Sequence, residues 1–312
     1  MKLPCALTIA GSDSGGGAGV QADLKTFAAL GVHGLCVITS VTAQNTQGVE
    51  GVFDLPPEFV AKQLDAVMRD FDVEWAKTGM LSNAEIIRAV EAGIKRHGLR
   101  VVIDPVMAST TGAPLLREEA FGSLLELLSS AELVTPNVSE AERLSGVKIR
   151  SRVDVRRAAR EIAELGPRAV LIKGGHLRGR EVVDLLYAKG KFTEFKGPRV
   201  LGEPTHGTGC SFSAAITAEL AKGASIRGAI DSARRFVVRA IEGRLDVGKG
   251  IMPVNPMAAL LLDAEKGRAI EEVWKAAKLL VAERKFAKLL PEVGSNIAMA
   301  LPGAERTSDV VG

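Results

Sequence analysis

Cysteine, net charge and long apolar runs are all scarce in this 312-residue sequence, and each scarcity excludes a class of protein. The three cysteines, Cys5, Cys36 and Cys210, lack the close spacing of a zinc or C-x-x-C site, so we expect reduced thiols. The 40 basic and 37 acidic residues leave a net charge of +3, which provides no basic field for nucleic acid or an anionic membrane. No apolar run nears the ~20 residues of a membrane-spanning helix, and residues 1–4 do not resemble a signal peptide. We therefore expect a cytoplasmic protein with no nucleic-acid partner and no membrane partner.

Strand-like apolar segments alternate with helical periodicity, and no solenoid repeat or low-complexity stretch interrupts them. Strands are predicted at residues 5–10, 35–40, 75–79, 101–104, 133–135 and 169–173. Helices are predicted at residues 18–30, 58–69, 83–96, 152–165 and 212–222. The alternation predicts right-handed βαβ units in a three-layer α/β/α sandwich with a mostly parallel central sheet. A Lys189-Gly190 turn adds an antiparallel hairpin of residues 181–188 and 191–195, so the sheet is predicted to be mixed.

A glycine-rich loop, AGSDSGGGAG at residues 10–19, joins the first predicted strand to the first predicted helix. Its five glycines allow backbone N–H groups to approach a ligand closely. The loop is neither a Walker A motif nor a G-x-G-x-x-G fingerprint, because Ala22 stands where the last glycine of the fingerprint would be. A flexible turn without a ligand is the alternative.

A second glycine loop, Gly207-Thr208-Gly209-Cys210, precedes an apolar helix. Its amides would point at an anion along the helix axis, which is the geometry of an oxyanion hole. Cys210 would lie in the first turn, where the field of the helix lowers the pKa of a thiol. A buried packing role for this cysteine is the alternative.

Further polar side chains follow other predicted strands. Asp104 ends one strand, and Asn137 and Glu140 are three residues apart in a following first turn, so the three can share a cation such as magnesium. Asn137 and Glu140 equally fit a capping box that needs no ligand. Lys173 ends another strand, where a cation suits a nucleotide phosphate.

Three residues near other strand or helix ends suit an aminopyrimidine. Asp23 and Gln44 together offer donors and acceptors to its edge, and Met80 can pack against its ring. Each of the three also fits ordinary loop chemistry.

In this order, the segments AGSDSGGGAG, QADLKT (21–26), DPV (104–106) and HGTGC (206–210) resemble the hydroxymethylpyrimidine/phosphomethylpyrimidine kinases of thiamine biosynthesis. The resemblance covers residues 7–254 and implies the ribokinase-like α/β/α sandwich, with a helical C-terminal extension. It implies ATP-dependent phosphorylation of 4-amino-5-hydroxymethyl-2-methylpyrimidine to its monophosphate and then to its diphosphate. A pyridoxal-type vitamin kinase, which also has cysteine at the position of the base, and a non-catalytic pyrimidine sensor are the alternatives.

The resemblance also implies a role for each matching position. The residues that it assigns to the pyrimidine are Gly11, Asp23, Gln44 and Met80. Those assigned to ATP are Lys173 and Thr208, and those placed near Mg²⁺ are Asp104, Asn137 and Glu140. Those assigned to catalysis are Cys210, as the base, and the amides of Gly207, Thr208 and Gly209. We expect the partners to be ATP, the pyrimidine and a second copy of the chain, in a homodimer or higher homo-oligomer.

The C-terminal region has a different character. Helices are predicted at residues 257–266 and 271–288, and residues 286–303 resemble the opening of an archaeal-type thiamine-phosphate synthase domain. We predict a kinase domain over residues 1–263 and a helical linker with a partial, truncated or degenerate synthase-like segment over residues 264–312. A complete synthase activity is not expected in this chain.

Overall fold

The structure is a computed structural model that describes residues 3–176, 181–200, 205–283, 296–302, 304 and 307–311. The chain forms two compact units, Met1–Pro256 and Met257–Gly312. The division between them lies slightly upstream of residue 263, where the sequence analysis places the end of the kinase domain.

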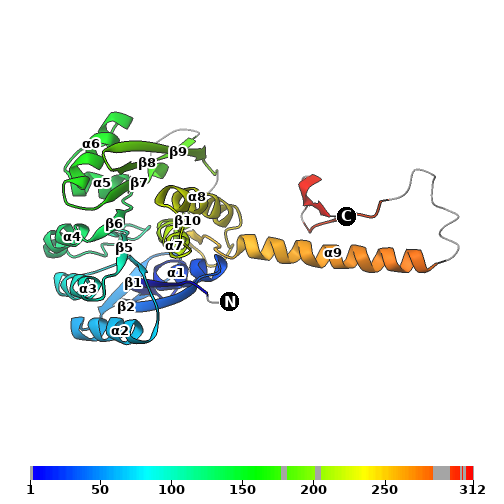
Figure 1. The fold of residues 1–312 in the computed structure, drawn as a ribbon, viewed down its shortest axis with the longest axis horizontal. Coiled ribbons are helices and arrows are strands. Elements are labelled where there is room, and N and C mark those ends of the chain that lie inside the picture. The colour runs from blue at the N-terminus through cyan, green and yellow to red at the C-terminus, as the bar shows by residue number, and fades with distance from the viewer. Residues whose placement is uncertain are drawn as a thin grey trace. The chain divides into compact units, whose positions relative to one another are not determined.

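The first unit is built on one nine-stranded sheet (Figure 1). In the order in which they lie across the sheet, its strands are β3 (Val49–Asp54), β2 (His33–Gln44), β1 (Cys5–Asp13), β4 (Trp75–Thr78), β5 (Arg100–Ile103), β6 (Ala131–Val134), β7 (Ala169–Ile172), β8 (Glu181–Ala188) and β9 (Lys191–Pro198). The six from β2 to β7 are parallel, whereas β3, β8 and β9 are antiparallel to their neighbours. The predicted mixed sheet and its hairpin are therefore confirmed.

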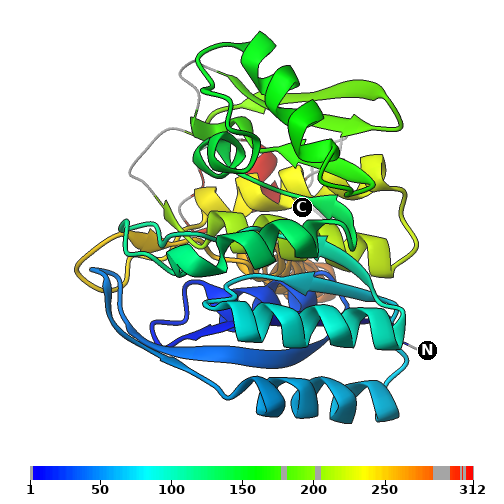
Figure 2. The ribbon, with the colours of Figure 1, turned by 90° about the vertical axis from the view of Figure 1, so that its left-hand side faces the viewer.

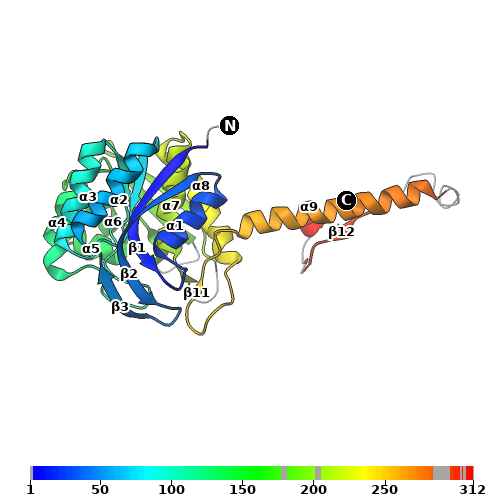
Figure 3. The ribbon, with the colours of Figure 1, turned by 90° about the horizontal axis from the view of Figure 1, so that it is seen from below.

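Helices cover both faces of this sheet (Figures 2 and 3). One face carries α2 (Pro57–Asp70), α3 (Ala84–His97), α4 (Phe121–Leu128), α5 (Val138–Ser145) and α6 (Arg152–Ala163); the other carries α1 (Gly19–Ala29), α7 (Thr208–Ala221) and α8 (Ile226–Glu242). The period of a strand explains the two cores, because Val101 and Ile103 of β5 pack on the first face and Val102 packs on the second. The predicted three-layer sandwich is confirmed.

Two helices, α4 and α8, and the strand β3 are additions to the predicted elements, whereas α5 is the helix that is expected to begin near Asn137. Strand β3 pairs with β2 at the edge of the sheet and leaves Val52 and Phe53 exposed, so its apolar pattern does not mark a buried strand. Two short 3-10 turns, η1 (Glu118–Ala120) and η2 (Gly174–His176), and a small parallel pair, β10 (Thr205–His206) with β11 (Met252–Pro253), complete this unit.

Helix boundaries follow local sequence signals. Asn83 caps α3 by accepting a hydrogen bond from the Ile86 amide, and the left-handed Gly98 ends the same helix. Because the strands from β2 to β7 are parallel, their carboxyl ends lie at one edge of the sheet. The polar residues that follow β1, β4, β5, β6 and β7 are consequently gathered at that edge.

The second unit contains α9 (Ala258–Ala282) and an antiparallel pair, β12 (Met299–Ala300) with β13 (Val310–Val311), joined by η4 (Thr307–Asp309). Two helices are predicted here, but α9 continues through Gly267, because one glycine weakens a helix by only about 1 kcal/mol. Residues 284–288 of the second predicted helix lie outside the described residues. No helix in the described ranges has the length and apolar character needed to span a membrane.

Candidate active site

A large cleft opens at the carboxyl edge of the parallel strands in the first unit. Its volume is about 1430 Å³, and its walls come from the ends of β1, β4 and β5, the start of α7 and one side of α8. Pockets for a single small ligand are usually about 300–1,000 Å³. The cleft therefore has room for two ligands side by side.

The glycine-rich loop after β1 is organised by its own aspartate. Asp13 Oδ1 accepts a hydrogen bond from the Gly15 amide at 2.8 Å. Its Oδ2 accepts from the Gly17 and Ala18 amides at 3.1 and 2.8 Å. The sequence analysis expects these amides to face a ligand, but the structure directs three of them at Asp13. The loop therefore forms a wall of the cleft, and its Gly15, Gly17 and Ala18 amides are used by Asp13 rather than left for an anion.

Three of the four residues predicted to contact a pyrimidine line the cleft together: Gly11, Gln44 and Met80. Gly11 is required for the close approach of the thioether, because a Cβ at this position would lie 3.0 Å from Met80 Sδ. Thr39 Oγ1 holds the Met80 backbone by donating to its carbonyl oxygen at 2.8 Å. These residues form a small pocket with a soft apolar wall and one amide.

Asp23 is the exception, because its carboxylate lies behind the cleft wall and is fully buried. Lys77 Nζ contacts its two oxygens at 2.9 and 2.7 Å, and Thr8 Oγ1 donates to it at 2.6 Å. Lys77 itself lines the cleft. Burial disfavours the charge of Lys77, but Asp23, Cys210 and Asp104 outweigh that effect and raise its pKa. Asp23 thus acts on the cleft through a lysine that the sequence analysis does not assign.

A second lysine–aspartate pair lies where β5 and β7 end. Lys173 Nζ is 2.8 Å from Asp104 Oδ1, and Thr135 and Ser213 donate to the same carboxylate at 3.2 and 3.3 Å. Burial disfavours the charge of Lys173, but Asp104 and Glu140 raise its pKa, so the cation is retained. Lys173 lies beside Gly209, where a Cβ would be 3.5 Å from Nζ.

Asn137 and Glu140 form the capping box that the sequence analysis leaves open. Asn137 Oδ1 accepts from the Glu140 amide at 2.9 Å, and Glu140 Oε2 accepts from the Asn137 amide at 2.7 Å. Burial raises the pKa of Glu140 to about 7, with Lys173 opposing and Asp104 adding to the shift. Both residues line the cleft, together with Asp104.

These residues fit magnesium only in part. Asn137 Oδ1 and one oxygen each of Glu140 and Asp104 are already used by the cap and by Lys173. Within the described part of the chain, no group of three or more His, Cys, Asp or Glu side chains is arranged to hold a metal. The carboxylates of Asp104 and Glu140 therefore suit a hydrated cation carried by a ligand, and Asn137 does not suit direct ligation.

The helix α7 begins at the cleft. Gly207 adopts the left-handed conformation (φ 82°) and has no side chain to accept from the opening amides of Thr208, Gly209 and Cys210. Those amides and the positive end of the helix dipole suit an anion. Thr208 Oγ1 lies 2.9 Å from Thr205 Oγ1, which fixes the first residue of the turn.

The thiol of Cys210 lies in the first turn of α7, close enough to Lys77 for the two charges to interact. The sequence analysis expects the helix to lower its pKa, but burial raises the pKa of this thiol to about 11. Lys77 and the Gly19 amide lower the pKa and only partly offset burial. The expectation of a low pKa is wrong for the ligand-free cleft, because loss of hydration outweighs the field of one helix turn.

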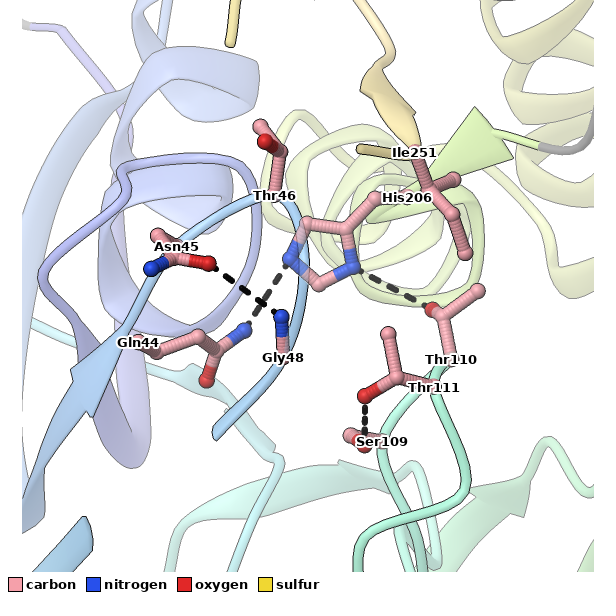
Figure 4. A pocket seen from close by; sticks show the side chains of 9 residues that line it. All are labelled: Gln44, Asn45, Thr46, Gly48, Ser109, Thr110, Thr111, His206 and Ile251. Carbon is pink, nitrogen blue, oxygen red and sulfur yellow. Dashed lines mark hydrogen bonds between the residues drawn. The ribbon is translucent and has the colours of Figure 1, made fainter. Parts of the chain in front are cut away.

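His206 is a further residue that the sequence analysis does not assign. It lies at the rim of the cleft between Gln44 and Thr110 (Figure 4). Its Nε2 atom is 3.2 Å from Asp13 Oδ2 and 3.1 Å from Gln44 Nε2, and its Nδ1 atom is 3.2 Å from Thr110 Oγ1. Its place directly before the predicted amide loop was the only signal in the sequence.

Comparisons with known proteins identify the family of this chain. The phosphomethylpyrimidine kinase family profile matches residues 13–255, and the profile described as thiamine-phosphate synthase ThiN matches residues 272–312. The chain is 48% identical over 254 residues to a hydroxymethylpyrimidine/phosphomethylpyrimidine kinase of Rhizobium meliloti, covering 80% of this chain and 96% of that protein. It is 50% identical over 255 residues to a thiamine biosynthesis bifunctional protein, ThiED, of Geobacter sulfurreducens, covering 81% of this chain but only 52% of that protein.

Solved structures of two kinases are also similar to this chain. A phosphomethylpyrimidine kinase from Clostridium difficile is 43% identical, with a TM-score of 0.69, and the match covers 77% of this chain and 100% of that chain. An ADP complex of Bacillus subtilis pyridoxal kinase is 37% identical, with a TM-score of 0.76, and the match covers 83% of this chain and 100% of that chain.

Proposed function

This chain belongs to the phosphomethylpyrimidine kinase family, and we propose that its first unit phosphorylates 4-amino-5-hydroxymethyl-2-methylpyrimidine with ATP in thiamine biosynthesis. The product monophosphate is then phosphorylated to the diphosphate. One observation carries the proposal: a single cleft is lined by Gly11, Gln44 and Met80, by the cation of Lys173 and the first residues of α7, and by Cys210.

The ATP side follows from charge and geometry. Lys173 keeps its charge inside the cleft, and the first amides of α7 supply hydrogen bonds that neutralise charge on a transferring phosphoryl group. Bound magnesium would screen the ATP phosphates, with Asp104 and Glu140 as its nearest carboxylates. Asn137 positions Glu140 through the cap rather than ligating the ion.

The alcohol step needs a base, and we assign that role to Cys210. A thiol with a pKa of about 11 is ionised in only about one molecule in ten thousand at pH 7. The cation of Lys77 favours the thiolate, so the thiolate fraction depends on the buried Lys77–Asp23 pair. The thiolate would accept the hydroxymethyl proton as the alcohol oxygen attacks the γ-phosphate.

The second phosphorylation needs no such base. Its nucleophile is a phosphate oxygen that is already ionised near neutral pH. The size of the cleft supports a shift of the substrate outward by one phosphate. Both steps would then share Lys173 and the α7 amides but differ in their need for Cys210.

The assay that tests this function follows hydroxymethylpyrimidine, its monophosphate and its diphosphate by mass spectrometry after addition of Mg·ATP. Successive appearance of both products is expected. Absence of both products, from protein with a native circular dichroism spectrum, would refute the proposal.

Pyridoxal phosphorylation is a second candidate activity, because solved pyridoxal kinases match this structure with a TM-score of 0.76. We expect the pyrimidine to be preferred, since Gln44 provides a polar contact that an aminopyrimidine edge uses fully. Comparison of kcat/KM for the two alcohols decides between them.

We also place the kinase activity entirely within the first unit, since all the residues that line the cleft precede Pro256. A chain ending after Asp263 should keep both kinase steps within about twofold of the full chain, as expected when no contact to substrate is lost. Loss of activity together with loss of the folded state would show that α9 supports the kinase unit. The segment of residues 264–312 stays a predicted partial synthase-like region, supported by the profile match over residues 272–312.

The remaining expectations concern assembly and location. The exposed Val52 and Phe53 on the edge strand β3 support a homodimer, which light scattering coupled to size-exclusion chromatography would test. Free thiols at Cys5, Cys36 and Cys210 support a reducing compartment such as the cytoplasm.

A further inference from the structure

The hydrogen-bond partners of His206 determine which of its two ring nitrogens carries the hydrogen. Asp13 accepts three backbone N–H groups of the glycine-rich loop and also faces the imidazole. Burial disfavours the carboxylate, but the His206 contact and the Gly15 and Ala18 amides outweigh it and lower the pKa of Asp13. An ionised carboxylate only accepts hydrogen bonds, so His206 Nε2 must carry a hydrogen. In the neutral imidazole, the opposite nitrogen, Nδ1, then accepts from the hydroxyl of Thr110 at 3.2 Å.

This tautomer constrains the side chain of Gln44. With the amide drawn as in Figure 4, Gln44 Nε2 faces His206 Nε2 at 3.1 Å, which sets one donor against another. Thr42 Oγ1 has one hydrogen but lies within bonding distance of two acceptors, the Ser12 carbonyl at 3.0 Å and Gln44 Oε1 at 3.2 Å. Because amide nitrogen and oxygen are assigned from their partners, a half-turn of the amide removes both conflicts. Gln44 Oε1 and Asp13 Oδ2 then share the single Nε2 hydrogen of His206, and Gln44 Nε2 donates to Thr42 Oγ1, whose own hydrogen is free for the Ser12 carbonyl.

We propose that His206, held in the Nε2–H tautomer by Asp13, is a positioning residue that fixes the direction of the Gln44 amide and so selects the hydrogen-bonding edge of the substrate. The proposal rests on the proposed function in one respect, that Gln44 contacts the pyrimidine. A primary amide offers one donor and one acceptor side by side, and a half-turn reverses their order. An aminopyrimidine edge, with an amino group next to a ring nitrogen, matches only one order.

The burial of the network supports a fixed orientation. Asp13 is 4% exposed and the His206 side chain 12%. A wrong amide orientation would leave two N–H groups facing each other beside Asp13 and His206, which are largely closed to water, and such unsatisfied donors are unfavourable. That cost makes a single orientation dominant before substrate enters.

The tautomer is tested first, by long-range ¹H–¹⁵N correlation spectra of the ligand-free protein at pH 8. The sequence has four histidines, and the His206 signals are identified by their loss in His206→Gln. Protonated and bare ring nitrogens differ clearly in ¹⁵N chemical shift. We expect protonated Nε2 and bare Nδ1. The opposite tautomer would overturn the proposal, whatever the enzyme does.

The consequence for the substrate is tested with a matched pair of variants. His206→Gln places an amide N–H where His Nε2 lies, whereas His206→Asn places its amide near the position of Nδ1. We expect His206→Asn to raise the KM for the pyrimidine about tenfold, with the KM for ATP changed less than about threefold. His206→Gln should restore the pyrimidine KM to within about threefold of wild type.

His97 provides the control, because its Nε2 atom lies 2.7 Å from Asp65 in a similar pair outside the cleft lining. His97→Asn should leave both KM values unchanged. If His206→Asn weakened the two ligands equally, or if His206→Gln did no better, His206 would only support the neighbouring loop and the proposal would fail. An inactive but folded wild type would instead refute the proposed function and leave the tautomer measurement valid.

Discussion

Two lysine–aspartate pairs act on the cleft, and they differ in how far water reaches them. Lys77 and Asp23 are both fully buried and share two contacts of 2.9 and 2.7 Å. Lys173 is 14% exposed, its partner Asp104 is 2% exposed, and they share one contact of 2.8 Å. The first pair is closed to water although Lys77 borders the cleft, whereas Lys173 of the second pair is partly exposed there.

This difference indicates different uses of the same two residue types. A fully buried charge without its partner is strongly destabilising, so the Lys77–Asp23 pair is a fixed part of the protein. Lys173 reaches the cleft, so its charge can turn toward a ligand phosphate. Water from the cleft can then hydrate its partner, Asp104. We therefore expect the fully buried pair to matter most for folding and the partly exposed pair to matter most for catalysis.

Lys77→Met should have the largest effect, on stability. It leaves the Asp23 carboxylate buried without a cation, and removal of one partner of a buried pair costs about 3–5 kcal/mol in the free energy of unfolding. Urea denaturation measures this loss. The double variant Lys77→Met with Asp23→Asn should recover a large part of it, since no buried charge remains. A Lys77→Met variant as stable as wild type would show that the buried Lys77–Asp23 pair is not needed for folding.

Lys173→Ala should lower the rates of both phosphorylations together, by about 10²-fold, because both steps use its charge on the ATP phosphates. Its free energy of unfolding should fall far less than that of Lys77→Met, since removal of the Lys173 side chain opens Asp104 to the water of the cleft. Single-turnover rates for the two steps and urea denaturation measure these effects. Lys222→Ala, which removes the cation of a surface pair with Glu219, is the control and should change neither. A loss confined to one step would contradict the shared role.

Cys210→Ala tests the proposed general base of the alcohol step. Phosphorylation of the alcohol should slow by about 10²-fold, the usual contribution of a general base, while phosphorylation of the monophosphate should change little. The wild-type rate of the alcohol step should also rise from pH 7 to pH 10, because the pKa of the thiol is raised to about 11. Cys36→Ala, a half-buried thiol outside the cleft lining, is the control. Equal losses in both steps, or a rate of the alcohol step that does not change with pH, would show that Cys210 is not the general base.

Glu140→Gln should have the smallest effect, a change in the pH dependence of the free energy of unfolding. It tests a buried carboxylate beside the more exposed pair, Lys173 and Asp104. Burial raises the pKa of Glu140 in the folded protein to about 7, so the folded state holds the proton more tightly than the unfolded chain. Its contribution to stability is complete below about pH 4.5 and is lost as the pH rises through about 7. Glutamine keeps the capping box but removes this titration. Between pH 5 and pH 8, wild type should lose about 2–3 kcal/mol more than the variant in the free energy of unfolding. Identical pH dependences would show that Glu140 does not titrate there.

The sequence predicts the candidate site well where a residue's role depends on its place at the end of an element. Lys173, Asp104 and the loop before α7 all line the cleft as expected, because the ends of parallel strands meet at one edge. It predicts less well where a role depends on a partner. Asp23 is expected at the substrate but contacts Lys77, and Asn137 is expected near a metal but caps α5. Lys77 itself stands in a short apolar strand, where nothing local marks a charged contact.

The layered α/β architecture, the two glycine loops and the order of the motifs follow from the sequence alone, because strand and helix periods and turn residues act over a few neighbours. Which charges meet depends on how distant segments fold together. Lys77 and Asp23 are 54 residues apart, Lys173 and Asp104 are 69 apart, and His206 and Asp13 are 193 apart. The tertiary structure also decided the pKa of Cys210, since removal from water depends on packing from distant segments and outweighs the local field of the helix.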